Sequence, residues 1–437
     1  MNQPIIEWGH PNTDAALAGL AQEGRVHSRL YTDPGIFELE MQRIFSRAWI
    51  YIGHTSEVPK GGDYQLRRMG RTPVILVRGR DDEVRVLLNR CRHRGTQVTE
   101  TESGNTKFFR CWYHGWAYDT TGKLVEVTEP GGYGANFRKE DMGLTPVPRV
   151  DTYRQFVFAS LAPEGESLAQ SLGGPASKII DLLVDASPTG SIHVDGGTHK
   201  AVYKGNWKLV GMDGYHPNYV HSSVVAAWAR NAEFGIGAMH REDPFVDAAP
   251  SRTRDLGHGH CMLDFQQHRL GHYEQHCGFL KKIPGGEKYI EDMYRAYDRD
   301  RAKLLIALAG DPHIGVHPNM QLIGNQVRIV NPLAVDRTEV VMTAVRLGGV
   351  SDEVNAVRLR QHESFYGPAG AGSPDDGEIF ERAQRGMMAE VEPWVDLSRG
   401  MEREETDADG TLVGRITDET TQRGQMRRWK ALMTGAK

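Results

Sequence analysis

Two short stretches of the sequence each contain one cysteine and one histidine. Cys91 and His93 are separated by one residue, and Cys111 and His114 are separated by two. Two thiolates and two imidazoles on a pair of loops are the ligands of a Rieske-type [2Fe–2S] cluster, in which two cysteines bind one iron and two histidines the other. A tetrahedral zinc site is the alternative, although zinc ligand pairs usually have two to four intervening residues.

A glycine follows each of the two ligand stretches. Gly95 and Gly115 lack a side chain, so we expect them to let the backbone turn tightly around the inorganic core, with backbone amides donating to sulfur. Each stretch also comes directly after a β-rich run, VRVLLN in one case and KFF in the other. Both stretches are therefore predicted on loops at strand ends.

A second group of metal-ligating side chains occurs in the segment NWKLVGMDGYHPNYVH, residues 206–221. His216 and His221 are five residues apart, which places them about 140° apart around a regular helix and prevents them from binding one ion. Pro217 favours a break between them, because the residue before a proline is pushed out of the α region. Two histidines that meet at such a break, together with one carboxylate, would form a mononuclear iron site with open positions for O2 and substrate.

A candidate for that carboxylate lies in the later segment GPAGAGSPDDGEIFERAQRG. Ser373 can cap a helix whose first residue is Pro374, which places Asp375 and Asp376 in the first turn, with one of them facing inward. The alternative is that both acids only complement the helix dipole. His216 and His221 could likewise be ordinary core or surface residues.

With both groups of residues identified, the sequence resembles the α subunit of the Rieske non-haem iron aromatic-ring-hydroxylating oxygenases. The resemblance spans most of the chain and rests on the segments CRHRG…CWYHGW, NWK…DGYHPNYVH, IGNQVRIVNPLAVDRTEV and GPAGAGSPDDGEIFERAQRG. Accidental agreement of two unrelated metal motifs, in the expected order and spacing, is improbable, and this disfavours the zinc alternative.

The resemblance implies a role for each matching residue. The cluster ligands would be Cys91, His93, Cys111 and His114, and the ligands of the mononuclear Fe(II) would be His216, His221 and Asp376. Asp375 is the weaker choice for the carboxylate. Asp213 would hydrogen-bond an iron histidine and a cluster histidine of the neighbouring subunit, and so couple the two centres. The family therefore implies a homotrimer, α3, or an α3β3 assembly with a small β subunit.

The stretch before Asp213 departs from the family pattern. Members usually have a Glu-Asn pair between NWK and the aspartate, whereas here only residues 209–212 separate Lys208 from Asp213, about three residues fewer. Either the preceding loop is shorter or the iron helix begins later, so the helix register at this site is expected to differ. Trp112 also replaces a proline that is frequent in the second cluster loop.

The resemblance also implies a reaction and its partners. The chain would be a terminal oxygenase that hydroxylates an aromatic compound, in particular an aromatic carboxylate, by adding both atoms of O2 to give a cis-dihydrodiol. Electrons would come from NADH through a separate reductase and in some members a ferredoxin, since this sequence has no dinucleotide or flavin motif. The alternatives are a Rieske monooxygenase or demethylase on the same scaffold, and a pure Rieske electron carrier.

Candidate substrate-binding residues lie beside the iron histidines. The predicted pocket lining is Tyr219, Val220, Val224 and Val225, with ordinary core packing as the alternative. Arg254 or Arg328 could pair with a substrate carboxylate, although solvated surface positions are expected for both.

Cysteines and histidines also gather between residues 256 and 277. A further metal site could involve His258, His260, Cys261, His276 and Cys277. The spacing completes no tetrahedral set, so we expect a loop near the pocket mouth, with Cys261 and Cys277 buried as small hydrophobes.

The elements that position these residues predict an α+β fold. Residues 1–44 are predicted as an N-terminal helical segment that packs on the catalytic domain, residues 45–162 as a small all-β Rieske domain, and residues 163–437 as the catalytic iron domain, with an antiparallel β-sheet flanked by helices. In the first segment, Asp33 is expected to cap a helix that begins at Pro34.

Several elements of the catalytic domain can be predicted from periodicity. The runs QLIGNQVRIVNPL and TEVVMTAVRLGG are expected to pair as strands, and SDEVNAVRLRQHESF to form a helix. The face of that helix is predicted from spacing to carry Val354, Val357, Gln361 and Phe365. The last helix is predicted to bury Met426, Trp429 and Met433 as core.

Composition excludes several classes of protein. The chain has 437 residues, 39% of them hydrophobic, and a formal net charge of -5 with acidic and basic residues mixed along the sequence. This balance gives no basic stripe for nucleic acid or anionic lipid. The N-terminus lacks a signal-peptide pattern and no apolar run is long enough to cross a bilayer, so a cytoplasmic location is expected.

Overall fold

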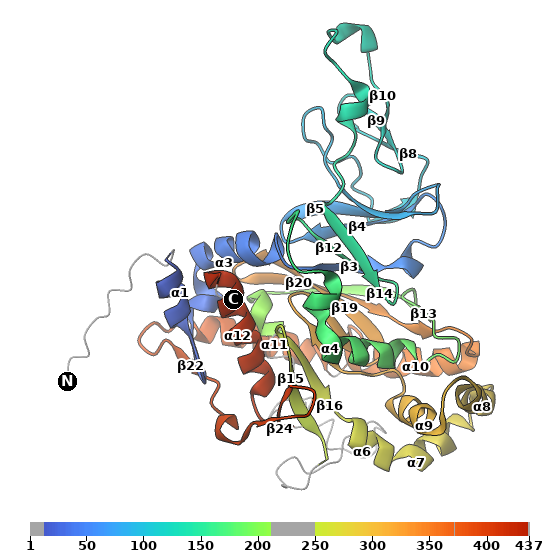
Figure 1. Cartoon of the computed structure of the whole chain (residues 1–437), viewed down its shortest axis with the longest axis vertical. Helices are drawn as coiled ribbons and strands as arrows, with labels where there is room; N and C mark the ends of the chain where they lie inside the picture. Colours follow the sequence, from blue (N-terminus) through green and yellow to red (C-terminus); the bar gives the residue numbers. More distant parts are fainter. Residues whose placement is uncertain (1–12, 211–249, 371, 436–437) are drawn as a thin grey trace. The chain divides into compact units, whose positions relative to one another are not determined.

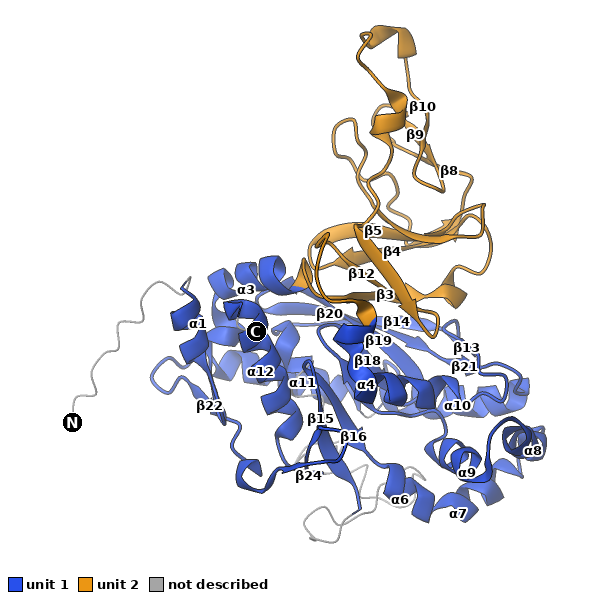
Figure 2. Cartoon of the chain, viewed as in Figure 1, with its two compact units in different colours: residues 1–44, 169–437 blue, residues 45–168 orange. Residues whose placement is uncertain are grey.

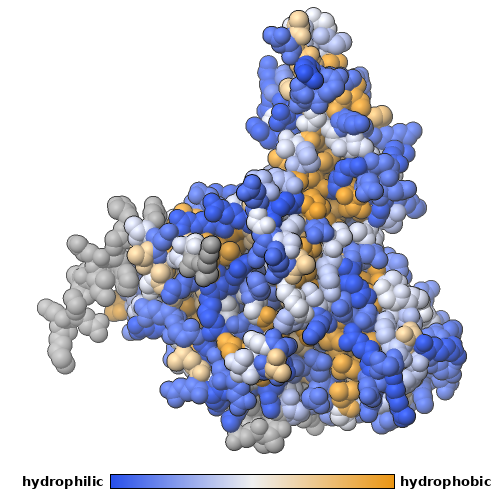
Figure 3. Space-filling model, in the orientation of Figure 1, coloured by the Kyte–Doolittle hydropathy of each residue, from blue (hydrophilic) through white to orange (hydrophobic). Residues whose placement is uncertain are grey.

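The computed structural model describes residues 13–210, 250–370 and 372–435. The chain divides into two compact units, a smaller one of residues 45–168 and a larger one of residues 1–44 together with 169–437 (Figures 1 and 2). None of the helices in the described ranges combines the length and apolar character that crossing a bilayer requires. On the face drawn in Figure 3, hydrophobic residues are interspersed among hydrophilic ones.

The smaller unit consists of three antiparallel sheets. Their strands, in spatial order, are β6 (Val84–Leu88), β5 (Thr72–Arg78), β4 (Asp63–Met69) and β7 (Ser103–Asn105); β10 (Leu124–Glu126), β9 (Ala117–Asp119) and β8 (Phe108–Arg110); and β11 (Arg149–Tyr153), β12 (Phe156–Ser160) and β3 (Ile50–His54). The 3-10 turns among them are η2 (Thr55–Glu57), η3 (Pro130–Gly132) and η4 (Lys139–Met142). The expected all-β character of this region is confirmed.

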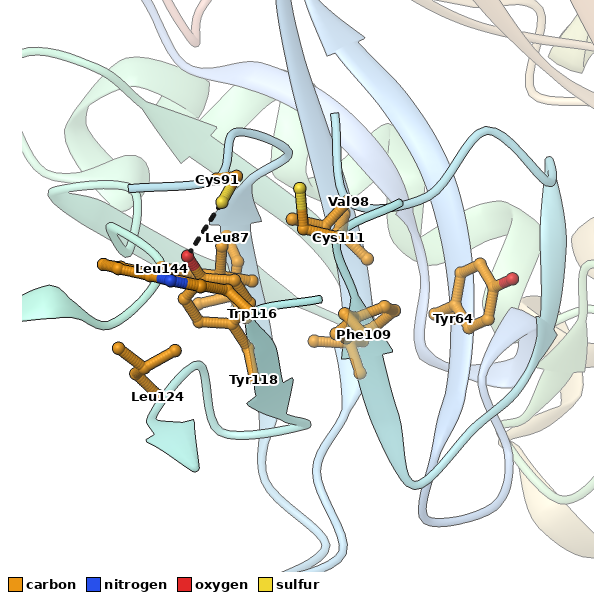
Figure 4. Close-up of a cluster of buried hydrophobic side chains, with 12 residues drawn as sticks. Tyr64, Leu87, Cys91, Val98, Phe109, Cys111, Trp116, Tyr118, Leu124 and Leu144 are labelled. Carbon is orange, nitrogen blue, oxygen red and sulfur yellow. Dashed lines mark hydrogen bonds between the residues drawn. The ribbon is translucent and has the colours of Figure 1, made fainter. Parts of the chain in front are cut away.

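The core of the smaller unit lies between the first two of these sheets. Strand residues Ile75 and Val77 on β5 and Leu87 on β6 are buried in one cluster with Phe109 and Tyr118 from β8 and β9 (Figure 4). Alternate side chains of a strand point to opposite faces, so each strand contributes its inward residues to this cluster. The cluster also contains the two cysteines of the ligand loops.

The larger unit is built on a nine-stranded antiparallel sheet. In spatial order the strands are β14 (Thr198–Tyr203), β20 (Arg337–Ala344), β19 (Gln326–Ala334), β18 (Met320–Ile323), β17 (Ile314–Val316), β16 (His260–Asp264), β15 (Arg252–Gly257), β24 (Leu412–Arg415) and β23 (Glu405–Thr406). The predicted pairing of the two β-rich runs is confirmed, with Val330 opposite Val340. Short strands β1 (Ala21–Gln22), β2 (Arg25–His27) and β22 (Trp394–Asp396) form a second sheet, and β13 (Ile192–His193) pairs with β21 (Arg346–Leu347).

Helices flank this sheet, as the sequence predicts (Figure 1). They are α1 (Asp14–Leu20), α2 (Arg29–Thr32), α3 (Pro34–Glu40), α4 (Leu168–Val184), α6 (Gln266–Gly271), α7 (Tyr273–Leu280), α8 (Gly286–Ala296), α9 (Arg299–Leu308), α10 (Asp352–Tyr366), α11 (Ser373–Gly386) and α12 (Thr420–Thr434). Helix α3 begins at Pro34, and the Asp33 carboxylate accepts hydrogen bonds from the amides of Gly35 and Ile36. The predicted cap is therefore confirmed, as is the buried stripe of α12.

Two helix predictions were wrong in detail. Helix α10 buries Val354, Asn355, Arg358 and His362, whereas Gln361 is exposed. The prediction from apolar spacing was wrong here because buried polar side chains find hydrogen-bond partners in other elements. The Asn355 side chain, for example, forms hydrogen bonds with the backbone of Leu347. In α11 the N-cap is Gly372 and Ser373 is already helical, so Ser373 does not cap the helix.

Candidate functional site

The two Cys/His stretches form matching loops in the smaller unit. Gly95 N–H donates to the Cys91 carbonyl over 2.9 Å, and Gly115 N–H donates to the Cys111 carbonyl over 3.0 Å. Both glycines have positive φ, +81° and +72°, which L side chains rarely adopt. The loops follow β6 and β8, so the predicted position at strand ends is confirmed.

The four donor side chains of these loops form two close pairs, one of cysteines and one of histidines. Both cysteines are 2% exposed, and the Cys111 thiol is within hydrogen-bond range of Cys91. The rings of His93 and His114 have centroids 4.6 Å apart. Among the described residues, the Nδ1 atom of each ring is buried without a hydrogen-bond partner, and a bound metal ion would supply one.

The chemistry of this donor set fits a two-iron cluster better than a single ion. Within the described ranges, no three His, Cys, Asp or Glu side chains converge as the ligands of one metal ion do. A [2Fe–2S] cluster instead needs one pair of donors at each iron. Burial, with His93 and Arg94 nearby, lowers the pKa of His114 and favours the neutral ring that metal ligation requires.

Hydrogen bonds to sulfur complete this site. Burial raises the pKa of the Cys111 thiol, while backbone N–H groups of Tyr113 and His114 lower it. The Tyr118 hydroxyl on β9 lies 3.2 Å from Cys91 Sγ and accepts the Arg92 N–H over 3.0 Å (Figure 4). A cysteine sulfur that binds a metal carries no proton, so with a cluster bound the Tyr118 hydroxyl would be the donor of this bond. Sequence reasoning did not find Tyr118; its inward position on a strand was the available signal.

A second candidate site is a pocket of about 400 Å³ in the larger unit. Asp376, in the first turn of α11, lines this pocket, whereas Asp375 does not. Burial raises the pKa of Asp376 to about 7, and the nearby Arg328 opposes that rise. A desolvated carboxylate in a pocket is typical of a functional site.

The rest of the pocket wall combines apolar side chains with polar and charged ones, which include Lys200, Arg328, Glu378 and Glu381. Its apolar lining includes Val210, Ile323, Val340, Met342 and Phe380. Arg328 is 9% exposed, and its guanidinium carbon is 4.9 Å from the centre of the Tyr366 ring. The expected surface position of Arg328 was therefore wrong. Arg254 is partly exposed and pairs with Asp264 and Asp407.

Most of the predicted iron and pocket residues belong to the segment 211–249, which the structure does not describe. Asp213, His216, His221, Tyr219, Val220, Val224 and Val225 all lie outside the described residues. Of the three expected iron ligands, only Asp376 has a described position.

The additional histidines and cysteines form no metal site within the described ranges. Cys261 is buried on strand β16 and Cys277 on helix α7, which confirms both as small buried residues. The expected loop was wrong, because this segment is a β-hairpin followed by helices.

Two family models match the chain. The Rieske [2Fe-2S] domain matches residues 48–145, and the catalytic domain of the ring hydroxylating alpha subunit matches residues 191–431. The chain belongs to the ring-hydroxylating oxygenase alpha subunits. A pure electron carrier would lack the second of these domains.

Relatives and solved structures agree with this membership. The large subunit of anthranilate 1,2-dioxygenase from Acinetobacter baylyi is 33% identical, over 86% of this chain and 80% of that protein. The large subunit of 2-halobenzoate 1,2-dioxygenase from Burkholderia cepacia is 32% identical, over 92% and 86%. Naphthalene 1,2-dioxygenase from Rhodococcus sp. superposes with a TM-score of 0.76 at 27% identity, covering 96% of this chain and 98% of that one.

The family resemblance drawn from the sequence is thus confirmed. The protein is an aromatic ring-hydroxylating terminal oxygenase of the dioxygenase family, and its cofactors are a Rieske [2Fe–2S] cluster and a non-haem iron. Members of the family act with a reductase and form oligomers.

Proposed function

We propose that this subunit cis-dihydroxylates an aromatic carboxylate, with electrons that pass from NADH through a separate reductase. One observation carries the proposal: a single chain holds a paired Cys/His site and a pocket with the carboxylate of Asp376 in its wall. Relatives named for anthranilate, 2-halobenzoate and toluate support an aromatic acid as the substrate class.

Residues 45–162 would form the Rieske domain. Cys91 and Cys111 would bind one iron, and the buried Nδ1 atoms of His93 and His114 would bind the other. Tyr118 and the loop amides donate hydrogen bonds to the cysteine sulfurs and so stabilise negative charge there.

Residues 163–437, with the N-terminal segment 1–44 packed against them, would form the catalytic domain. His216, His221 and Asp376 would hold the mononuclear iron, and Asp213 would link an iron histidine to a cluster histidine of the neighbouring subunit. This link requires a neighbouring copy of the chain, which the proposed α3 or α3β3 assembly would supply. When bound, the cluster supplies single electrons and the mononuclear iron activates O2.

The pocket would hold the aromatic ring beside Asp376. Its apolar side chains, such as Val340, Met342 and Phe380, exclude water and pack against a flat ring. Tyr219, Val220, Val224 and Val225 are proposed as further lining residues. Of the two arginines considered for a substrate carboxylate, only Arg328 lines this pocket.

Product analysis tests the proposed reaction. The purified chain, a surrogate reductase, NADH and 18O2 are incubated separately with benzoate, anthranilate, naphthalene and biphenyl. We expect cis-dihydrodiols from the aromatic acids, with both oxygen atoms labelled. A product with a single labelled oxygen would show monooxygenation, and the absence of any product would contradict oxygenase function.

Two neighbouring acids give a matched pair of variants for the iron site. Asp376→Asn removes the charge without changing the size of the side chain, so we expect loss of the mononuclear iron and of product, with the cluster spectrum retained. Asp375→Asn changes the same charge in the same helical turn but outside the pocket, and should leave iron content and product unchanged. Equal losses in both variants would contradict the assignment of Asp376.

A further inference from the structure

The indole of Trp116 packs directly on one of the proposed cluster ligands. The rings of Trp116 and His93 are stacked, with an interplanar angle of 12° and centroids 5.0 Å apart. Trp116 is 1% exposed and lies in the same buried cluster as Cys91 and Cys111 (Figure 4). It therefore approaches His93 from the core of the smaller unit.

Two further aromatic rings extend from Trp116 to the surface. The indole N–H of Trp116 donates to the Tyr133 hydroxyl over 3.1 Å. Tyr133 stacks on Phe137, with centroids 4.3 Å apart and an interplanar angle of 24°. Both of these side chains are partly exposed and belong to residues 130–142, which include η3 and η4. A continuous path of rings thus joins His93 to the surface of the smaller unit.

A cluster that passes on electrons in every turnover needs a route by which electrons enter as well as a route by which they leave. In the proposed function, on which this inference rests, electrons leave through a cluster histidine bonded to Asp213 of a neighbouring copy. We propose that Trp116, Tyr133 and Phe137 form the route by which an electron from a reduced flavin or iron–sulfur donor protein enters the cluster. The donor loses one electron and the ferric pair gains it; no bond forms or breaks.

A rival route starts at His114. The ring of Tyr113 lies 3.8 Å from that of His114, and its side chain is 58% exposed. Trp112 beside it is 94% exposed, so this edge is open to a large contact. We assign this edge to the neighbouring copy that takes the electron. Trp116, in contrast, is held rigidly in the core by its stacking and its hydrogen bond.

Stopped-flow reduction of the holoenzyme distinguishes the two routes. Cluster bleaching is followed with a surrogate NADH-reduced dioxygenase reductase and, separately, with dithionite, a small reductant that needs no protein docking. We expect Trp116→Leu to slow reduction by the reductase by an order of magnitude or more and to leave the dithionite rate unchanged. Its indole donates to Tyr133 and not to a sulfur, so the hydrogen bonds to the cluster are kept. The EPR spectrum and reduction potential of each variant are measured as well, and slower reduction supports the route only in a variant whose potential is unchanged.

Further variants supply a control, and they keep the test possible if Trp116→Leu loses its cluster. Tyr64→Leu removes another aromatic ring from the same core away from the proposed path, and should leave both rates unchanged. Tyr133→Leu and Phe137→Leu change residues that are not cluster ligands, and both should slow reduction by the reductase without changing the dithionite rate. The affinity for the reductase is measured separately by calorimetry.

Three results would overturn the route. They are equal slowing with both reductants, no slowing in any of the three variants, or selective slowing in Tyr113→Leu instead. The proposed function fails separately if wild-type enzyme with a reduced cluster makes no hydroxylated product from any arene.

Discussion

The buried side chain of His260 makes the stability of this fold depend on pH. Its Nε2 lies 2.8 Å from the Ser171 carbonyl oxygen, and its Nδ1 accepts the His317 N–H over 3.0 Å. Only the neutral ring with its proton on Nε2 makes both bonds. Burial is the main cause that lowers the pKa of His260 to about 4, from a usual value of 6.5.

Acid should therefore destabilise the larger unit. Between pH 6.5 and 4 the unfolded chain binds the proton and the folded one does not, so stability falls as the pH falls through that window. From pH 7 to pH 5 we expect His260 to cost about 2 kcal/mol of unfolding free energy. In urea titrations, His260→Asn should weaken this pH dependence and His258→Asn, an exposed histidine of the same hairpin, should not. An unaltered dependence in His260→Asn would contradict the argument.

At the scale of elements, one buried carboxylate joins three segments. Glu40 on α3 accepts hydrogen bonds from Lys208 Nζ over 2.6 Å, from Trp429 of α12 over 2.7 Å and from Trp207 over 2.8 Å. The Lys208 and Glu40 side chains are 1% and 0% exposed. Burial lowers the pKa of Lys208, and the Glu40 charge opposes that shift. Glu40 thereby anchors the residues that lead into the predicted iron helix.

Breaking this ion pair should be costly, and removing both charges should be less so. Lys208→Met leaves a buried carboxylate unpaired, for which we expect a loss of about 3–5 kcal/mol in unfolding free energy. The double variant Glu40→Gln/Lys208→Met should recover part of that loss, as measured by urea denaturation. Arg382→Met, in the exposed pair with Glu378 on α11, should cost about 0.5 kcal/mol or less. A double variant as unstable as Lys208→Met would point to lost packing instead of lost charge balance.

At the scale of the whole molecule, the two proposed metal centres belong to different units. The cluster ligands all lie within residues 91–114, whereas Asp376 belongs to the larger unit. Chelation under mild conditions should therefore lower the iron content from about three to about two atoms per chain, because only the mononuclear site is open. Hydroxylation should cease while the visible spectrum of the cluster persists, and added Fe(II) should restore activity. Loss of colour together with activity would show that the centres are not independent.

Local features of the fold could be predicted from the sequence because short-range geometry decides them. The Asp33 cap, the paired strands β19 and β20 and the buried stripe of α12 follow from residue types a few positions apart. The buried face of α10 was missed because several of its buried residues, such as Arg358 and His362, are polar. The spacing of apolar residues therefore does not mark that face.

The spacing of Cys91, His93, Cys111 and His114 indicated a metal site on two short loops, and only together with the second metal motif of residues 206–221 did the sequence favour a [2Fe–2S] cluster over zinc. Only the tertiary structure decided that Asp376, and not Asp375, faces the pocket, that Arg328 is buried there, and that Trp116 stacks on His93. These facts depend on packing between residues far apart in the chain. No local pattern encodes that packing, because many different partners could satisfy the same side chain.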